Sequence, residues 1–372
     1  MKLAVITRHA VFNYGSLLQT IATRQILETL GHQCVIIDYR REDEDYRKIA
    51  ATLLKSTPRW NSSPLRRMVY TLLQSPKFYI MGRHFEKMRK GAFPVTRRYR
   101  SDEELRQDPP EADVYITGSD QVWGPIGTDA YDPAFFLNFS EEKSRRISYA
   151  ASFGKTEFTP ELKSRFAEML GRYEAITVRE NSAVALIREM GISHVQQVLD
   201  PTLLIPAEVW AQKITDTFPR SYILVYQLHN NQRMLEYAYA MSEKTGLPLV
   251  TMSSTAQHLS HKGSKHVFLP SLSQWLGYIK NASFMITDSF HGTAFAINFG
   301  TQFINVLPEE TSTRNRSILE LTGLQNRVVT DFSDLSFLER PIDFAPVHRI
   351  IRENRQRSYD ILDQLLNKKE SL

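Results

Sequence analysis

The sequence predicts an α/β protein made of two doubly wound domains, in which parallel strands alternate with helices. At 372 residues the chain exceeds one typical core, since domains usually hold about 100 to 200 residues. Short apolar runs also alternate with helical segments, which is typical of a parallel sheet covered by helices on both faces. The same alternation restarts near residue 222, so we expect two similar domains.

The first domain is predicted over residues 1–208. It opens with the buried strand "KLAVIT", the loop "RHAVFNYGS", the helix "LLQTIATRQILETLG" and the strand "CVIIDY". Further along come "DVYIT", "RISYAA", a helix over Pro160–Tyr173, "AITVR", a helix over Ser182–Met190 and "VQQVLD". The stretch "PTLLIPAEVW" then predicts a linker. This order places loops at the carboxyl ends of parallel strands, where ligands bind in such folds.

The second domain is predicted over residues 209–345, and a charged C-terminal helix over 346–372. Its elements are "YILVYQL", a helix near Gln232–Lys244, "LPLVTM", "HVFLP", a helix over Ser273–Lys280, "SFMIT", a helix after His291 and "QFINVL". We expect the C-terminal helix to pack back on the first domain. The whole arrangement resembles the glycosyltransferase-B architecture, with two Rossmann-like domains and a site between the carboxyl ends of their sheets.

A basic helical insert is predicted at about residues 51–105. Residues 51–100 contain twelve Lys or Arg and one acid, Glu86, which is a net charge of +11. One interpretation is a solvated helical insert, and the other is peripheral contact with an anionic membrane. Nucleic acid is not expected as a partner, because no recognition motif accompanies the charge.

The N-terminus and the lack of a long apolar run in the sequence predict a cytoplasmic protein. The first residues, "MKLAVITRHAVFNYG", lack the long apolar core of a signal peptide, and no run approaches the roughly 18 apolar residues of a membrane span. Cys34 lies in an apolar strand, where a buried structural thiol is expected. We therefore expect the protein in the cytoplasm, with the inner face of the membrane as its place if the basic insert docks there.

Four loops at predicted strand ends carry polar residues that packing does not require. The candidate residues in the first domain are Asn13, Tyr14, Gly15, Ser16, Ser119, Asp120, Gln121 and Arg179. Those in the second domain are Ser289, His291, Gly292, Thr293 and Arg314. Each loop has an ordinary structural interpretation as a turn or a salt bridge, but their shared position favours a common site.

The stretch "ITDSFHGTAFAI" predicts an anion site with a proton-handling residue. If a helix begins near Gly292 or Thr293, its first backbone amides are free to bind an anion. Gly292 would permit close approach of the ligand, and His291 titrates near neutral pH. The loop therefore suits a phosphate or a carboxylate.

The other loops suggest partners for that anion and for a sugar. Arg179 offers a planar guanidinium for a carboxylate or phosphate, or else a salt bridge to Glu180 or Glu174. Trp123 offers a stacking face for a pyranose, or else a buried core side chain. Arg314 and Arg316 form a possible second anion clamp. No metal site is expected, since His258, His261 and His266 are unevenly spaced in a polar loop.

Seven motifs in order resemble the polysaccharide pyruvyl transferase family. They are "NYGSLLQTIATRQILETLGH", "VIIDYR", "ITGSDQVWGP", "ISYAASFG", "ITVRE", "VLDPTLL" and "ITDSFHGTAFAINFG". The resemblance implies transfer of a pyruvyl group from phosphoenolpyruvate to a sugar hydroxyl pair, as a ketal, during assembly of a bacterial capsule, exopolysaccharide or cell-wall polymer. It implies no cofactor, and a saccharide acceptor that is lipid-linked in some pathways. Arg179 and His291 match the residues that the family is thought to use on phosphoenolpyruvate.

One position departs from the family pattern. Ser289 stands where other branches often carry arginine, so Arg314, Arg316 or Arg8 is expected to supply the missing phosphate ligand. His291 is expected to act as general acid or base, and Asp120 to orient or deprotonate a sugar hydroxyl. The alternatives are a glycosyltransferase that uses a nucleotide sugar and a non-catalytic carbohydrate-binding subunit. The acceptor sugar, the choice between ketal and enol ether, and the oligomeric state stay open.

Overall fold

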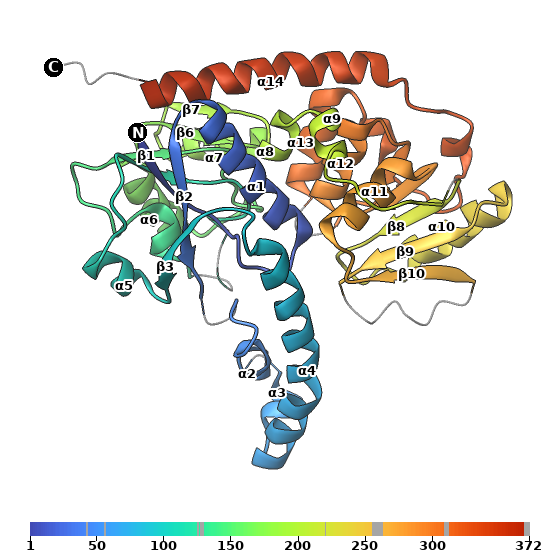
Figure 1. Ribbon diagram of the computed structural model, residues 1–372, viewed down its shortest axis with the longest axis horizontal. Helices are drawn as coiled ribbons and strands as arrows, with labels where there is room; N and C mark the ends of the chain where they lie inside the picture. The colour runs from blue at the N-terminus through green and yellow to red at the C-terminus, as the bar shows by residue number, and fades with distance from the viewer. Residues whose placement is uncertain are drawn as a thin grey trace.

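The computed structural model describes residues 1–41, 44–55, 57–124, 126, 130–219, 221–254, 263–308 and 312–367. Within these ranges the strands form two five-stranded parallel sheets and a smaller two-stranded one, with helices packed on their faces (Figure 1). The predicted α/β class is therefore confirmed, and its two sheets lie in the two halves of the chain.

The first sheet has the order β3-β2-β1-β4-β5. Its strands are Val95–Tyr99 (β3), Gln33–Tyr39 (β2), Lys2–Ile6 (β1), Val114–Thr117 (β4) and Arg145–Ser148 (β5). Leu3 lies opposite Cys34 on one side and Val114 on the other. The central strands are buried on both faces, which explains their nearly continuous apolar sequence. Cys34 is buried there, as predicted.

Helices cover this sheet, and a short strand pair extends it. The helices are Tyr14–Thr29 (α1), Asp102–Gln107 (α5), Pro160–Leu170 (α6) and Asn181–Glu189 (α7). The strand pair is Ile176–Val178 (β6) with Val195–Gln197 (β7). Parallel bridges from Ile147 to Ala175 and from Ala151 to Val178 join this pair to the β5 side of the sheet.

The second sheet repeats the same spatial order, β10-β9-β8-β11-β12. Its strands are Ser264–Phe268 (β10), Leu249–Ser253 (β9), Ile223–Tyr226 (β8), Phe284–Thr287 (β11) and Phe303–Asn305 (β12). Its helices are Gln232–Thr245 (α10), Leu272–Asn281 (α11), Phe290–Phe299 (α12) and Thr313–Thr322 (α13). The chain reverses its winding between the neighbouring strands β1 and β4 in the first sheet and between β8 and β11 in the second. The loops after β1, β4, β8 and β11 thus stand at the two switch points.

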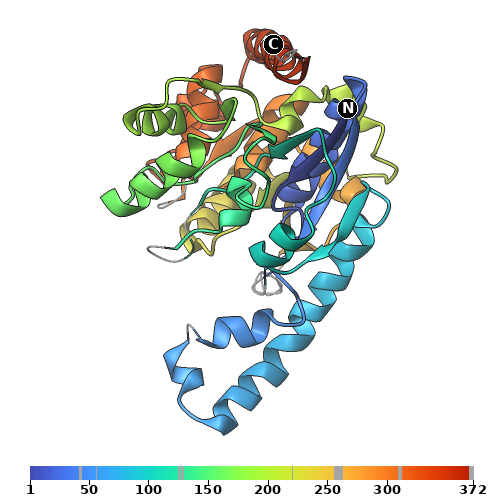
Figure 2. The same cartoon turned by 90° about the vertical axis from the view of Figure 1, so that its left-hand side faces the viewer.

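The basic segment differs from the prediction in its second half. Three helices lie between β2 and β3 in the chain: Ile49–Lys55 (α2), Pro58–Asn61 (α3) and Pro64–Arg89 (α4). Residues 95–99 then form β3, the edge strand of the first sheet, because Tyr39 pairs with Tyr99 and Asp38 with Arg98. The helical insert is therefore shorter than the expected 51–105. Figures 1 and 2 show α2, α3 and α4 projecting together from the body of the protein.

Two short helices form in the segment that was predicted as a linker. They are Pro201–Leu204 (α8) and Ala207–Ala211 (α9), so the expected domain boundary at residue 208 falls inside a helix. Asp200 caps α8, and Trp210 is fully buried with its indole N–H donating to the Thr202 carbonyl. Asn298 of α12 donates to the carbonyls of Thr202 and Ile205. The connection between the halves is thus packed and bonded.

The C-terminal helix, Phe344–Asn367 (α14), crosses both halves (Figure 1). It begins at Phe344, two residues before the expected start at residue 346. At one end His348 contacts the Ile297 carbonyl of α12, and at the other the Arg145 guanidinium donates to the Leu365 carbonyl. The expectation that it packs back on the first half is confirmed, and it also packs on the second. In the part of the chain that the structure describes, no helix combines the length and apolar content needed to cross a membrane.

We predict that Ser358→Ala lowers the free energy of unfolding by about 1–3 kcal/mol. The Ser358 hydroxyl accepts the buried Leu199 N–H at 3.0 Å, and alanine leaves that donor without its acceptor. Chemical denaturation measures the change. Ser164→Ala, on the exposed side of α6, is the matched control and should stay within about 0.5 kcal/mol of the wild type. If Ser358→Ala and Ser164→Ala lowered the free energy of unfolding equally, the hydrogen bond between Leu199 and Ser358 would not be the cause of the loss.

Candidate functional site

A cavity of about 450 Å³ lies between the two sheets, and we call it the central cleft. The residues that line it from the first half include Arg8, Asn13, Ser16, Asp120 and Gln121. Those from the second half include Asp288, Ser289, Phe290, His291 and Arg314. Three of the four predicted loops thus meet here, because the carboxyl ends of both sheets face each other.

His291 lies in the first turn of α12 and faces the first half of the chain. The helix begins at Phe290, with Ser289 as its N-cap, and so starts earlier than Gly292 or Thr293. The residue is 5% exposed, and its Nε2 lies 3.8 Å from a carboxylate oxygen of Asp200. That Nε2 is buried from solvent and forms no hydrogen bond with any residue that the structure describes. His291 lines the central cleft, so a ligand bound there would be its neighbour.

The imidazole of His291 is neutral at pH 7. Burial lowers the pKa of His291 to about 4, and the negative charge of Asp200, which acts in the opposite direction, does not offset burial. A neutral ring can accept a proton at Nε2. The free protein therefore presents a base at this position.

Gly15 lets the first turn of α1 approach this histidine. A Cβ atom built on Gly15 would lie 2.0 Å from Nδ1 and 2.2 Å from Cγ of His291. No side chain fits in that space, so glycine is required by close approach. Asn13 caps the same helix by accepting the N–H groups of Gly15 and Ser16. The two helix starts therefore fix each other's position.

Asp120 stands across the cleft in a strained backbone conformation. Its φ of +87° is one that L-residues rarely adopt, and such strain is typical of functional sites. The Ser16 hydroxyl and the Gln121 N–H both donate to its carboxylate. Burial by itself raises the pKa of Asp120, but Arg179, His291 and the Ser16 hydroxyl together outweigh burial and hold that pKa well below its usual range. The carboxylate is ionised.

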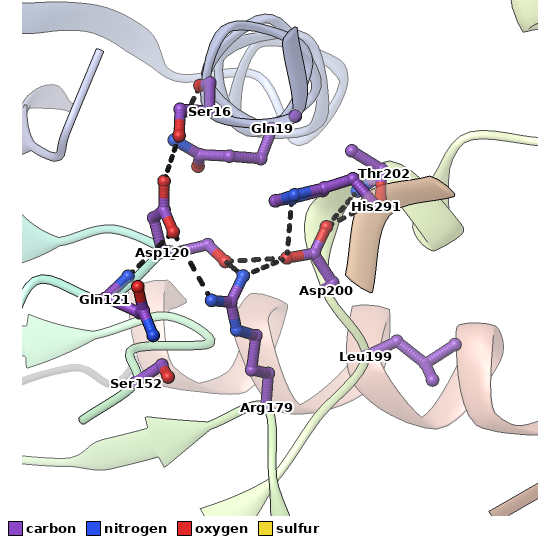
Figure 3. A network of polar contacts seen from close by, with 12 residues as sticks. Ser16, Gln19, Asp120, Gln121, Ser152, Arg179, Leu199, Asp200, Thr202 and His291 are labelled. Atoms are coloured by element: carbon purple, nitrogen blue, oxygen red, sulfur yellow. Dashed lines mark hydrogen bonds and ion pairs between the residues drawn. The ribbon is translucent and has the colours of Figure 1, made fainter. Parts of the chain in front are cut away.

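Arg179 lies behind the cleft near three carboxylates, two of which, Asp120 and Asp200, are seen beside it in Figure 3. Its guanidinium is 3.0 Å from Asp200, 3.4 Å from Asp120 and 3.7 Å from Glu180, and it stacks on Phe290 at 4.7 Å from the ring centroid. The expected free fork is therefore not present in this conformation, because Nη1 donates to Asp200 and Nη2 to Asp120. The salt bridge to Glu180 is present, whereas Glu174 instead pairs with Arg145.

Arg314 is the cation that faces the cleft without an opposing carboxylate. It lies in the first turn of α13 and forms no ion pair within the described part of the chain, and its Nε has no hydrogen-bond partner there. Burial lowers the pKa of Arg314 to about 10, with a further contribution from Arg179, so it stays charged at neutral pH. Arg8 also lines the cleft but is paired with Glu44 at 2.7 Å. Arg316 lines a neighbouring cavity of about 800 Å³.

Several predicted residues have structural contacts away from the cleft. The Tyr14 hydroxyl donates to the Pro270 carbonyl, and its ring stacks on Trp275, so it joins the two halves. Trp123 is fully buried against Phe136 and Phe153, and it therefore offers no face to a sugar. Ser119 is fully buried and donates to Asp200.

The amides expected to bind an anion are already used within the fold. The Gly292 N–H donates to the Ser289 hydroxyl, and the Thr293 N–H donates to the Ser289 carbonyl. A Cβ on Gly292 would meet Thr287 Oγ1 at 2.7 Å, so this glycine serves the packing of α12 on β11 and not the approach of a ligand. Thr293 is fully buried, where its hydroxyl accepts from Asn305.

Sequence reasoning missed one buried acid of the network, Asp200, whereas Glu180 was expected as a partner of Arg179 and is one. Asp200 precedes Pro201 and caps α8, so its sequence context indicates only a helix start. Its other oxygen binds Arg179 and Ser119, and nothing local predicts that. The one feature of the sequence that could have indicated a site residue is the place of Asp200 at the end of the predicted strand "VQQVLD". Burial raises the pKa of Glu180, although Arg179 and the Ser152 hydroxyl oppose this.

No cluster of potential metal ligands occurs among the described residues. His258 and His261 lie outside those residues, and His266 contacts the Thr251 hydroxyl at 2.8 Å.

We predict that Gly15→Ala lowers the free energy of unfolding by about 1–3 kcal/mol, because the new methyl group collides with the His291 ring. Thermal denaturation measures it. In a His291→Ala background the ring atoms at 2.0 and 2.2 Å are absent, so the cost of Gly15→Ala should shrink. The same cost in both backgrounds would rule out this contact as the cause.

We also predict that burial of His291 makes the fold sensitive to mild acid. The unfolded residue has a pKa near 6.5 and the folded one about 4, so the unfolded chain binds more protons between these values. The contribution to stability is full above about pH 6.5 and is lost as the pH falls towards 4. Urea titrations across this range measure how far the free energy of unfolding falls with pH. We expect that fall to be up to about 3 kcal/mol smaller in His291→Gln than in the wild type. Parallel pH profiles of the two proteins would contradict the prediction.

Solved structures with the same arrangement are sugar-nucleotide enzymes of low identity. A putative UDP-N-acetylglucosamine 2-epimerase from Listeria monocytogenes has a TM-score of 0.56 and 9% identity, covering 100% of this chain and 98% of that one. The Methanocaldococcus jannaschii UDP-GlcNAc 2-epimerase in complex with UDP-GlcNAc and UDP has a TM-score of 0.52 and 13% identity, covering 99% and 100%. Arabidopsis thaliana UGT89C1 complexed with UDP-L-rhamnose has a TM-score of 0.51 and 11% identity, covering 99% and 98%. At these identities the likeness shows the fold, which is of the glycosyltransferase-B type.

A comparison with curated protein sequences found no match. The family model for polysaccharide pyruvyl transferase, in contrast, matches residues 13–309. This range begins at the N-cap of α1 and ends beyond β12, so it includes both walls of the central cleft. By the extent of this match, which takes in His291, Asp120 and Arg179, the chain belongs to the polysaccharide pyruvyl transferase family.

Proposed function

We propose that the central cleft transfers a pyruvyl group from phosphoenolpyruvate to a pair of sugar hydroxyls during the synthesis of a bacterial surface polysaccharide. The observation that carries the proposal is the pair of residues on one wall of the cleft, His291 and Arg314. The imidazole of His291 is neutral and its Nε2 has no hydrogen bond, and Arg314 has no carboxylate partner among the described residues. Family membership supplies the class of reaction. Phosphoenolpyruvate carries two anionic groups, which suit this wall.

In the first step a sugar hydroxyl adds to C2 of phosphoenolpyruvate. The neutral His291 accepts the hydroxyl proton at Nε2 as the new C–O bond forms. In the same step the C2=C3 π bond breaks, and its electron pair takes that proton from the imidazolium to form the new C3–H bond. Asp200, 3.8 Å away, stabilises the imidazolium. The product is a tetrahedral carbon that carries a methyl group, the carboxylate, the phosphate and the sugar oxygen.

In the second step the phosphate leaves, and a second hydroxyl closes the ketal. The C–O bond to phosphate breaks with its electron pair, and the proton of the second hydroxyl leaves with the phosphate or through His291. Arg314 would hold the phosphate, since Ser289 supplies no cation. If C3 instead lost its new proton, the product would be an enol ether.

Asp120 and Arg179 have different roles in this scheme. Asp120 lies at the cleft as an ionised carboxylate, and it would orient the attacking hydroxyl. Arg179 is a positioning residue in the conformation described, because it holds Asp120 and Asp200 and is enclosed by them. Direct contact of Arg179 with the donor would require those ion pairs to open.

A glycosyltransferase that uses a nucleotide sugar is the second candidate. The observation in its favour is the neighbouring cavity of about 800 Å³ at the carboxyl edge of the second sheet, lined by residues that include Arg233 and Arg316. The Methanocaldococcus jannaschii epimerase of similar fold was solved in complex with UDP-GlcNAc and UDP. The unbonded His291 and the unpaired Arg314 lie in the central cleft, and they favour the pyruvyl reaction.

We predict that His291→Gln lowers kcat for phosphate release by about 10²–10⁴-fold while the protein stays folded. Arg314→Gln should mainly raise KM for phosphoenolpyruvate, and Arg314→Lys should restore part of the loss because a cation remains. Phosphate release and product mass are measured with phosphoenolpyruvate and candidate saccharides. His194→Gln, whose imidazole contacts the Tyr173 carbonyl away from the cleft, is the matched control.

The product mass separates the candidate functions. A ketal formed in deuterium oxide carries deuterium in its methyl group, whereas an enol ether has no methyl group. A strict requirement for a nucleotide sugar, or near-normal turnover in His291→Gln, would refute the pyruvyl proposal. A saccharide that binds without any turnover would indicate a non-catalytic subunit.

A further inference from the structure

The three helices α2, α3 and α4 form a projecting arm, which we define as residues 49–90. The arm is inserted between β2 and β3 and extends away from the body on the side opposite α14 (Figures 1 and 2). Its main element, α4, has 26 residues and is therefore about 39 Å long. The central cleft does not need so long a projection.

The outer face of α4 is apolar and exposed, contrary to the usual pattern of a surface helix. The exposed fractions are 66% for Leu65, 54% for Met68, 66% for Leu72, 65% for Leu73, 51% for Tyr79 and 55% for Ile80. Their spacing of three, four and seven residues places them on one side of the helix. We call these six residues the apolar stripe. An exposed apolar surface of this kind usually marks an interaction site.

Basic residues continue and flank the apolar stripe. Arg83, Lys87 and Lys90 are exposed and follow it at helical spacing on the same side, towards the body. The arm contains nine Lys or Arg and one acid, Glu86. Glu86 is already bonded to Arg40 and to the Tyr46 hydroxyl, so it does not neutralise the positive charge of the Lys and Arg residues of the arm.

A basic basin lies at the foot of the arm. Two neighbouring cavities of about 520 and 360 Å³ share Glu86 and Lys90 in their linings. Arg83 and Lys87 line the first cavity. Arg40, Arg89 and Arg98 line the second together with Asp38, which forms ion pairs with Arg40 and Arg98. The exposed bases of the first cavity, Arg83, Lys87 and Lys90, therefore suit the phosphate of a lipid headgroup.

We propose that the arm docks on an anionic lipid bilayer. The apolar stripe would enter the boundary between headgroups and acyl chains, and the bases at its end would lie at headgroup level. A second copy of the chain is a poorer occupant of this face. In a symmetric pair, Arg66 and Lys77 beside the stripe would approach the same bases of the partner, and the arm offers no unbonded acid among its described residues to oppose them.

The foot of the arm is fixed to the site. Met81 lines the central cleft, and His84 contacts both the Tyr14 hydroxyl and the Pro270 carbonyl. Docking would therefore hold the mouth of the cleft near the bilayer. If the proposed function is correct, the acceptor saccharide is carried on a membrane lipid, and this one consequence rests on that function.

Vesicle flotation tests the docking without any enzymatic readout. The probes are vesicles of phosphatidylcholine alone and of phosphatidylcholine mixed with phosphatidylglycerol. We expect the wild type to float with the anionic vesicles only, and less so as salt is raised. Leu72→Ser/Leu73→Ser and Arg66→Glu/Arg67→Glu should each weaken binding by about tenfold or more. Arg349→Glu/Arg352→Glu, on exposed positions of α14, makes the same charge change elsewhere and should leave binding unaltered.

Every other outcome overturns the proposal. Equal flotation with neutral vesicles, no flotation, or equal loss in the α14 control would remove the arm as a docking surface. Light scattering reports the mass in solution, and a wild-type dimer that Leu72→Ser/Leu73→Ser converts to a monomer would make this face an interface between copies. Phosphate release with a soluble saccharide should be unchanged in the arm variants. Vesicle binding without any pyruvyl transfer would therefore refute the proposed function alone.

Discussion

The buried guanidinium of Arg179 is the contact on which the rest of the site depends. Asp120 and Asp200 approach it from two different loops, and each is bonded in turn to another element. Asp120 is held by Ser16 of α1, and Asp200 caps α8 and faces His291 of α12. Removing one member of such a network leaves the others as uncompensated buried charges. This single cation thus ties together loops from both halves of the protein.

The same burial sets the chemistry of His291. Water is excluded by Gly15 on one side and by Phe290 on the other, so the charged imidazolium is disfavoured in the free protein. The carboxylates of Asp120 and Asp200 act in the opposite direction and would stabilise the imidazolium once a proton arrives. A residue between these opposing influences is suited to accept a proton and to give it back. An anion bound at Arg314 would shift the balance further towards the protonated form.

The two sheets differ in what they contribute although their strand order is the same. The first supplies carboxylates and the start of α1, and the second supplies the imidazole and Arg314. The connection through α8 and α9 and the long α14 hold the two together by buried bonds to backbone carbonyls. Geometry between the halves is therefore set by packed helices. The arm adds an exposed apolar face whose residues lie in the same chain segment as the highest density of bases.

By itself the sequence determined the order of strands and helices and the position of polar loops at strand ends, because periodicity over five to twenty residues encodes each of these locally. Strand β3 was missed, since "VTRRY" is too basic to resemble a buried strand and survives only as an exposed edge. Tertiary structure alone decided which polar residues meet. Tyr14 bonds Pro270, 256 residues away, and Gly15 touches His291, while Trp123 packs inward. Such contacts depend on how two sheets dock, and no local pattern carries that information. The neutral state of His291 follows for the same reason, because its pKa is set by burial that exists only after the halves have joined.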